Sequence, residues 1–166
     1  KGKAKRIQIY INLQTCWKSK FHFLTSATYK IHSLNQGALR PLVPILLINP
    51  DTGQRIRVDA LIDTGADACS FPKHLADITG HNLKGSNVES SVSSGIGGVE
   101  IKTWKHSFLI GLLDPTSNRV LKWTNKQLID CFDHNNAPPL LGSKNFLKDF
   151  IIEINYPYKE IKLTWK

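Results

Sequence analysis

The sequence is poor in the features that mark disulfide-rich, metal-binding and membrane-spanning proteins. It has three cysteines in 166 residues, widely spaced and without a Cys-x-x-Cys pair, which argues against a disulfide framework or a cysteine-based zinc site. The six histidines show no metal-ligand spacing either, so we expect no metal and no cofactor. The longest nearly apolar run, residues 41–48, is too short to cross a bilayer, so no membrane partner is expected. The odd cysteine count and the lack of an Asn-x-Ser/Thr sequon favour a reducing, cytoplasmic compartment.

Methionine is also absent, so Lys1 is not a translation start. We expect that the chain was trimmed or that a longer precursor was cut. In either case a targeting segment upstream of Lys1 would not be visible in this sequence.

Acidic residues are missing from the first 50 positions, which hold eight of the 22 Lys and Arg residues. The remainder has 14 basic and 13 acidic residues, so the net charge of +9 belongs almost entirely to the N-terminal region. The favoured interpretation is a solvated basic extension that packs strands onto the rest of the chain. One alternative is a nucleic acid or another anionic partner bound through residues 1–36, and another is a segment that occupies a binding cleft.

The pattern of apolar residues predicts a mainly β protein with one or two short helices. The length suits one domain with an appendage, and we place a basic extension with β structure at residues 1–39 and the main domain at residues 40–166. Apolar residues at every second position indicate strands, because alternate side chains of a strand point to the same face. In the extension we expect strands at residues 6–13 and near residues 21–23 and 29–31.

In the main domain, apolar runs and the turn signals between them predict three pairs of strands. The first pair, residues 42–49 and 55–62, is joined by the turn Asn49-Pro50-Asp51-Thr52-Gly53. The second joins residues 88–92 to residues 100–110 around a cluster of glycines, and the last covers residues 150–154 and 160–165. Residues 121–128 fit no single state. Residues 143–150 predict a short helix with Ser143 as its N-cap.

Asp63 stands out because an apolar strand delivers its carboxylate directly into a turn of small residues. Burying a carboxylate is costly unless it has a partner or a chemical purpose. An aspartate that only caps a β-turn is the structural alternative. The same Asp-Thr-Gly tripeptide begins at Asp51, but Pro50 precedes it and no apolar strand leads into it, so we interpret it as a hairpin tip.

The segment Ile62-Asp63-Thr64-Gly65-Ala66-Asp67 resembles the active-site turn of retroviral and retropepsin-like aspartic proteases. Three further segments match this family in the expected order. Ser94-Gly95-Ile96-Gly97-Gly98 resembles the glycine-rich flap tip, Pro139-Leu140-Leu141-Gly142 resembles the element beneath the active-site loop, and residues 150–165 resemble the terminal strands. The resemblance covers roughly residues 40–166 and is nearest to cellular, prokaryote-type members. It implies a closed β-barrel with a single lobe that forms a two-fold homodimer.

The resemblance also implies an aspartic endopeptidase that hydrolyses a polypeptide substrate. Hydrolysis without a metal or a covalent nucleophile needs an acid and a base, and two close carboxylates that share a proton supply both. With one such aspartate per chain, each chain of a homodimer would contribute its Asp63 to activate a water molecule. The implied catalytic residues are Asp63, Thr64 and Gly65, and the implied substrate-binding residues are Asp67, Gly95, Ile96, Gly97, Gly98 and Leu141. A turn-stabilising carboxylate is the alternative role for Asp67.

The sequence departs from the family pattern at two places. Ala66 stands where pepsin-like enzymes carry a serine that hydrogen-bonds the catalytic carboxylate; because the charged form loses a donor, we expect an optimum at mild acidity. After Gly142, retroviral members have an arginine that pairs with the residue matching Asp67, whereas this sequence has Ser143-Lys144-Asn145. Lysine cannot form a bidentate fork, so the dimer is expected to be weaker or held differently. The alternative function is therefore a peptide-binding module with little or no cleavage.

Cys69 and His74 are close enough in sequence to suggest a Cys/His nucleophile pair. No carboxylate that could orient the histidine is evident in the sequence. We therefore interpret Cys69 as a core cysteine and His74 as a surface histidine.

Overall fold

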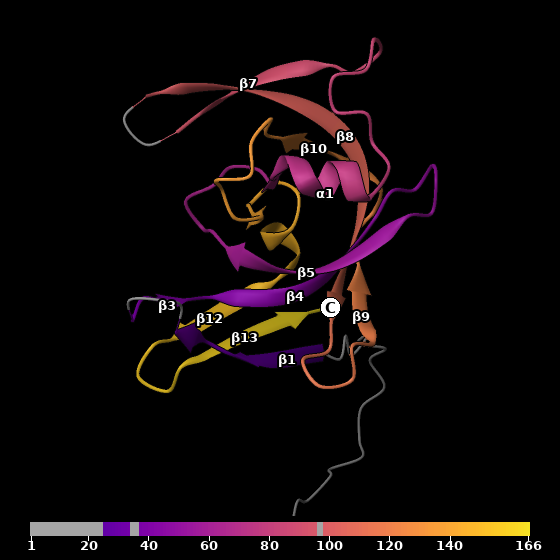
Figure 1. Ribbon diagram of the computed structural model, residues 1–166. Coiled ribbons are helices and arrows are strands. Elements are labelled where there is room, and N and C mark those ends of the chain that lie inside the picture. Colours follow the sequence, from indigo (N-terminus) through magenta and orange to yellow (C-terminus); the bar gives the residue numbers. More distant parts are fainter. Residues whose placement is uncertain (1–24, 34–36, 96–97) are drawn as a thin grey trace, which may run out of the picture.

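The computed structural model describes residues 25–33, 37–95 and 98–166, which form a mainly β structure (Figure 1). Within these ranges there are thirteen strands, one α-helix and one 3₁₀ helix. The strands are β1 (Thr25–Lys30), β2 (His32–Ser33), β3 (Leu39–Arg40), β4 (Leu42–Ile48), β5 (Arg55–Ile62), β6 (Ser70–Phe71), β7 (Ser90–Ser94), β8 (Glu100–Leu113), β9 (Val120–Trp123), β10 (Gln127–Cys131), β11 (Leu140–Leu141), β12 (Ile151–Asn155) and β13 (Glu160–Trp165). The helices are α1 (Lys73–Ile78) and η1 (Leu147–Asp149). In the described part of the chain, no helix is long and apolar enough to cross a membrane.

The hairpin of β4 and β5 leads directly to Asp63, and its two strands confirm the prediction for residues 42–62. Along β4, every second side chain is fully buried in the core, namely Val43, Ile45 and Leu47. This alternation follows from the period of two of a β-strand, and it fixes the register of the hairpin because a slip by one residue would expose the core face. The strands pair antiparallel over their whole length, from Leu42 opposite Leu61 to Ile48 opposite Arg55.

This hairpin belongs to an eight-stranded sheet. Its strand order is β10-β6-β11-β5-β4-β8-β7, with β9 paired to β8. Strand β10, at one end of this order, also pairs with β8, which lies near the other end. The short strand β11 lies parallel to β5, with Leu141 opposite Ile62. This pairing places Gly142, the residue after β11, beside Asp63, the residue after β5.

Strands β7 and β8 form the predicted second hairpin. They pair antiparallel from Ser90 opposite Trp104 to Ser94 opposite Glu100. The hairpin extends away from the rest of the molecule as an arm, on the side where β5 ends (Figure 1). Strand β8 is longer than predicted because it continues to Leu113 through the core, where it pairs with β4, β9 and β10. Residues 121–128 contain parts of β9 and β10.

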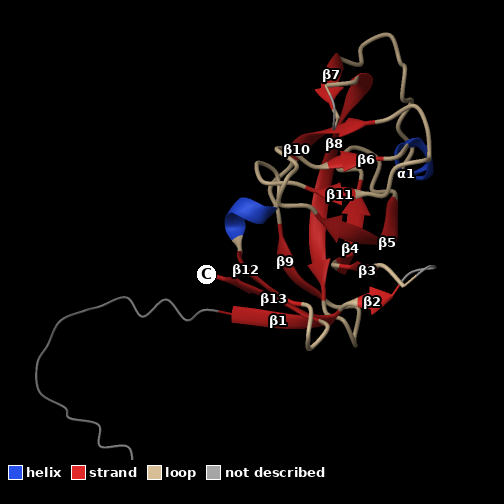
Figure 2. Ribbon diagram, turned by 90° about the vertical axis from the view of Figure 1, so that its left-hand side faces the viewer, coloured by secondary structure: helices blue, strands red, loops and turns tan. Residues whose placement is uncertain are grey.

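A second sheet of three strands, in the order β1-β13-β12, lies at the opposite end of the molecule from the β7–β8 arm (Figure 2). Strands β12 and β13 confirm the predicted C-terminal strand pair. Strand β1 pairs with β13 along its whole length, and the buried Tyr29 donates a hydrogen bond from its hydroxyl to the carbonyl of Leu113 over 3.0 Å. The expected strands at residues 6–13 and 21–23 lie outside the described residues, and the domain boundary at residue 40 stays a prediction.

The helices differ from the prediction. Helix α1 was not predicted, and the expected helix at residues 143–150 is instead a turn followed by the 3₁₀ helix η1. Ser143 is not an N-cap, because the 3₁₀ helix begins after Phe146 and no side chain caps it. The N–H and the hydroxyl of Ser143 both donate to the carbonyl of Ala66, over 2.9 and 3.2 Å. The tertiary contact with the Asp63 loop therefore takes the place of the expected cap, in which the Ser143 hydroxyl oxygen would have accepted a backbone N–H of the first helical turn.

Candidate active site

Asp63 is half-buried at the end of β5, where three hydrogen bonds donated by backbone N–H groups shape the loop around it. Its own N–H donates to the carbonyl of Leu141 over 3.2 Å, and its carbonyl accepts the N–H of Ala66 over 3.2 Å. The N–H of Gly65 donates to Oδ1 of the carboxylate over 3.0 Å. The first bond ties the loop to β11 and the last orients the carboxylate. The loop thus presents a fixed carboxylate with one oxygen already hydrogen-bonded.

Two glycines allow the close packing of this loop. A Cβ atom at Gly65 would lie 3.3 Å from Oδ1 of Asp63, so a side chain there would crowd the carboxylate. A Cβ atom at Gly142 would lie 2.3 Å from the carbonyl oxygen of Ala68, which is closer than real Cβ contacts come. The chain at Gly142 therefore approaches the backbone of the loop in a way that only glycine permits.

The residues after Gly142 contact the end of the same loop, at Asp67. The N–H of Lys144 donates to the carbonyl of Asp67 over 2.8 Å, and the Lys144 ammonium lies 3.6 Å from the Asp67 carboxylate. Both side chains are exposed, at 72% and 89% of their accessible surface. Lys144 thus contacts the acidic residue that the sequence suggested for it, through a single exposed ion pair. Thr64 is also exposed at the tip of the loop.

A cavity of about 590 Å³ opens between this loop and the β7–β8 arm. Its volume lies in the range of about 300–1,000 Å³ that is usual for ligand sites. It is lined by residues 65–70 of the loop, by residues 92–95 and Ile101 of the arm, and by Asp130, Phe132 and Lys144. Asp63 and Thr64 lie just outside this lining, at the start of the loop.

The tip of the arm is closed by backbone hydrogen bonds between glycines and their neighbours. The N–H of Gly95 donates to the carbonyl of Val99 over 2.9 Å, and the N–H of Gly98 donates to the carbonyl of Gly95 over 3.1 Å. Gly98 has a φ of +75°, which glycine adopts without strain. Ile96 and Gly97, two of the predicted substrate-binding residues, lie outside the described residues.

Asp51 and Asp63 occupy opposite ends of β5, and their surroundings differ. Asp51 lies in the turn before the strand, where its N–H donates to Oδ1 of Asn49 over 2.9 Å. Its carboxylate pairs with the ammonium of Lys126 at 2.8 Å and accepts a hydrogen bond from Ser107 at 3.1 Å, and these bonds hold its pKa below the usual range. The structure confirms that Asp51 is part of a hairpin tip, with its carboxylate paired within the same chain.

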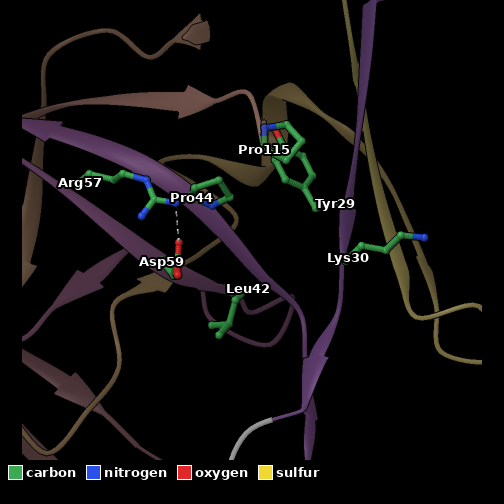
Figure 3. Close-up of a pocket in the computed structure, with 7 residues that line it drawn as sticks. All are labelled: Tyr29, Lys30, Leu42, Pro44, Arg57, Asp59 and Pro115. Atoms are coloured by element: carbon green, nitrogen blue, oxygen red, sulfur yellow. Dashed lines mark ion pairs between the residues drawn. The ribbon is translucent and has the colours of Figure 1, made fainter. Parts of the chain in front are cut away.

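A second cavity, at the junction of β1 with the β4–β5 hairpin, has a volume of only about 110 Å³ (Figure 3). It is lined by Tyr29, Lys30, Leu42, Pro44, Arg57, Asp59 and Pro115. Arg57 and Asp59 form an exposed ion pair at 3.8 Å beside it. This volume is well below the range of about 300–1,000 Å³ usual for ligand sites. We assign no function to this cavity.

Comparison with known proteins supports the same fold. No family model matches the sequence, and no curated protein matches it. Among solved structures, the chain is similar to a retropepsin-like aspartic protease from Rickettsia conorii, with a TM-score of 0.58 and 14% sequence identity. The match covers 86% of this chain and 94% of the other. The chain has a retropepsin-like fold. At 14% identity the match supports the fold.

Within the retropepsin-like fold, Leu141 supports the loop instead of facing the cavity. Its side chain is fully buried, and it does not line the cavity. Its carbonyl accepts the N–H of Asp63. A contact between Leu141 and substrate was predicted, but the Leu141 side chain has no exposed surface in this chain.

The two residues that suggested a Cys/His pair lie in different surroundings. Cys69 is fully buried, accepts the N–H of Gly142 at its sulfur over 3.3 Å, and has its pKa raised to about 12 by burial. His74 is half-buried at the start of α1, with its Nδ1 3.1 Å from the amide oxygen of Asn135. A thiol with so high a pKa is a poor nucleophile, so the structure favours a core cysteine.

Among the residues that line the cavity, the sequence did not point to Ser70, Ile101, Asp130 or Phe132. They come together because β10 pairs with β6 in parallel and with β8 in antiparallel fashion. Strand pairing between segments so far apart has no local signature in the sequence. The sequence offered one sign of Asp130, which is a charged residue directly after two apolar residues, as Asp63 is.

Proposed function

We propose that this chain is an aspartic endopeptidase that works as a two-fold homodimer of single-lobed, closed-barrel subunits. The observation that supports it best is the position of Asp63. It lies at the end of β5, held by the N–H of Gly65, beside a cavity that an arm covers. The retropepsin-like fold supports the same assignment.

The proposed chemistry requires a second carboxylate next to Asp63. The described part of the cavity lining contains two other aspartates, Asp67 and Asp130. The Asp67 carboxylate pairs with the Lys144 ammonium, and the Asp130 carboxylate accepts a hydrogen bond from Thr103. A second copy of Asp63, brought in by a two-fold axis, completes the site in this proposal. Two such carboxylates share one proton, because like charges roughly 3 Å apart do not both ionise readily. The ionised carboxylate then takes a proton from the attacking water, and the protonated one donates to the scissile amide.

The other site residues have roles that follow from their exposure. Thr64 is exposed at the tip of the loop, where its hydroxyl is free to contact the partner loop across the axis. Gly65 leaves room for the carboxylate. We propose that Asp67 and the arm around Gly95 and Gly98 bind the backbone of an extended polypeptide, since the arm and the loop form opposite walls of the cavity.

The test compares two single substitutions of chemically identical residues. Asp63→Asn is expected to abolish cleavage of a diverse peptide library from mild acid to neutral pH, while the circular dichroism spectrum stays that of the wild type. Asp51→Asn is the matched control and is expected to keep the activity, because Asp51 lies at the other end of β5. Loss of activity in Asp51→Asn and its retention in Asp63→Asn would overturn the assignment.

The second candidate function is a peptide-binding module, and the exposed Lys144 is the observation that favours it. A single ion pair between exposed side chains contributes little to stability, so the loop is less firmly held than it would be by a bidentate arginine. If the dimer forms but the wild-type chain cleaves no peptide in the library, this second function is the one to adopt.

A further inference from the structure

We propose that Asp130 makes the cavity select a lysine or arginine side chain of the peptide. The inference rests on the proposed function, because it assigns a substrate preference to the same site. Asp130 is half-buried in β10, and it lines the cavity of about 590 Å³.

The strand pairings show that the Asp130 side chain faces the cavity floor. Asp130 lies opposite Ser70 in β6 and opposite Lys105 in β8. Residues opposite each other in a sheet point to the same face, and so do residues two apart in one strand. Ser70 lines the cavity, and the buried Thr103, two residues before Lys105, donates a hydrogen bond to Oδ1 of Asp130 over 2.9 Å. The carboxylate is therefore held at a fixed place in the cavity floor.

Among the described residues, Asp130 forms no ion pair. Lys144 is paired with Asp67. The charge of Asp130 acts on Lys105, but the Lys105 ammonium forms its ion pair with Glu89. In the described lining, Asp130 is therefore the carboxylate that has no ion pair, and a cation from outside can supply one.

The apolar walls suit the long stem of a basic side chain. Ile101 and the exposed Val92 lie on the arm, and Phe132 lies just beyond Asp130. Lysine and arginine cover apolar surface with their methylene groups and keep the charged end free to form hydrogen bonds. An ammonium or guanidinium group that reaches Oδ2 of Asp130 forms a charge-assisted hydrogen bond, whereas a glutamate in the same place is repelled. In a two-fold dimer the preference would appear on both sides of the cleaved bond.

The test profiles cleavage of a peptide library in which each position carries Lys, Arg, Gln, Leu or Glu. Wild-type protein is expected to favour Lys or Arg at two positions related by symmetry about the cleaved bond. Asp130→Asn keeps an oxygen for Thr103 and is expected to lower kcat/KM for the basic peptides by about tenfold or more, the scale of a hydrogen bond to a charged group. The Gln and Leu peptides are expected to change little. The matched control is Asp133→Asn, since Asp133 is exposed, pairs with Lys84 and does not line this cavity.

A binding measurement separates this inference from the proposed function. Fluorescence anisotropy measures the affinity of Asp63→Asn protein for labelled versions of one peptide that carry Lys, Gln or Glu. The affinity is expected to fall in that order, and the added Asp130→Asn substitution is expected to remove the difference. If wild type cleaves nothing but the ranking persists, the endopeptidase assignment fails and the inference stands. If wild type cleaves without a basic preference, or if Asp130→Asn leaves that preference intact, the inference is wrong.

Discussion

Gly142 and Ala68 approach so closely that a Cβ atom at position 142 would lie 2.3 Å from the Ala68 carbonyl oxygen and 2.4 Å from its carbonyl carbon. The contact involves backbone atoms on the Ala68 side, so no side-chain rotation can relieve it. It joins β11 to the loop that presents Asp63, and this loop is the centre of the proposed site.

The first prediction follows from that contact. Gly142→Ala is expected to lower the free energy of unfolding by about 1–3 kcal/mol or more, the usual cost of overpacking. It is also expected to lower cleavage, because the loop must shift to admit the methyl group. Urea unfolding followed by tryptophan fluorescence measures the change in stability.

Gly95→Ala is the control for this substitution. A Cβ atom there would lie 3.7 Å from the Val99 carbonyl oxygen, which is an ordinary contact. Its effect on the free energy of unfolding is expected to stay within about 0.5 kcal/mol. Equal stability losses in the two variants would show that the close approach at Gly142 is not what constrains the loop.

The sequence predicted those parts of the fold that depend on local patterns. The β4–β5 hairpin was predictable because residues 42–48 form a short apolar run that ends in a turn with Asn49, Pro50 and Gly53. The β12–β13 pair was predictable because apolar residues alternate along residues 160–165 and Tyr156-Pro157 marks the turn before them. Asp63 could be identified because a carboxylate directly after an apolar strand is unusual.

The parts that the sequence did not predict depend on tertiary contacts. Helix α1 has only six residues and two buried side chains, Leu75 and Ala76, which is too short for a helical period to be visible. Its ends carried the only signals, with Pro72 before it and Gly80 after it. Ser143 looked like an N-cap, but its donors bind Ala66 from a distant loop.

The second prediction concerns the pH dependence of cleavage. Ala66 offers no hydroxyl beside the loop, and its N–H donates to the carbonyl of Asp63. Ala66→Ser is expected to move the acidic limb of the kcat/KM profile to lower pH, because a donor to the ionised carboxylate favours the charged form. Ala68→Ser, two residues farther along, is expected to leave the limb in place. A limb that does not move, or that moves to higher pH, would contradict this role of position 66.

The third prediction concerns stability. His81 and His106 pack with their ring centroids 4.7 Å apart, and burial lowers the pKa of both rings; repulsion from a charged His106 lowers the pKa of His81 further. Asp51 lies near enough to offset part of the shift at His81. The unfolded chain therefore binds more protons than the folded chain below the ordinary histidine pKa of about 6.5. The free energy of unfolding is expected to fall as the pH drops through this range.

Urea midpoints measured from about pH 7.5 to pH 5 test this prediction. The double variant His81→Gln/His106→Gln removes both titrating rings, and a glutamine amide at position 106 keeps a donor for the Leu83 carbonyl that His106 now contacts at 3.2 Å. Its stability is expected to depend less on pH than that of the wild type. His134→Gln, which removes a ring stacked on Phe132 away from this pair, is the control. An unchanged slope in the double variant would place the acid sensitivity elsewhere.

The most direct test of the central claim is a subunit-mixing measurement. Wild-type and Asp63→Asn chains are unfolded together in varying ratios, refolded and assayed for cleavage, with Asp51→Asn replacing Asp63→Asn in a parallel series. If each active site needs Asp63 from both copies, activity falls with the square of the wild-type fraction, so an equal mixture retains about one quarter of the activity. The Asp51→Asn mixtures are expected to stay fully active. A fall in direct proportion to the wild-type fraction, with half of the activity left in the equal mixture, would show that one chain suffices and would contradict the account.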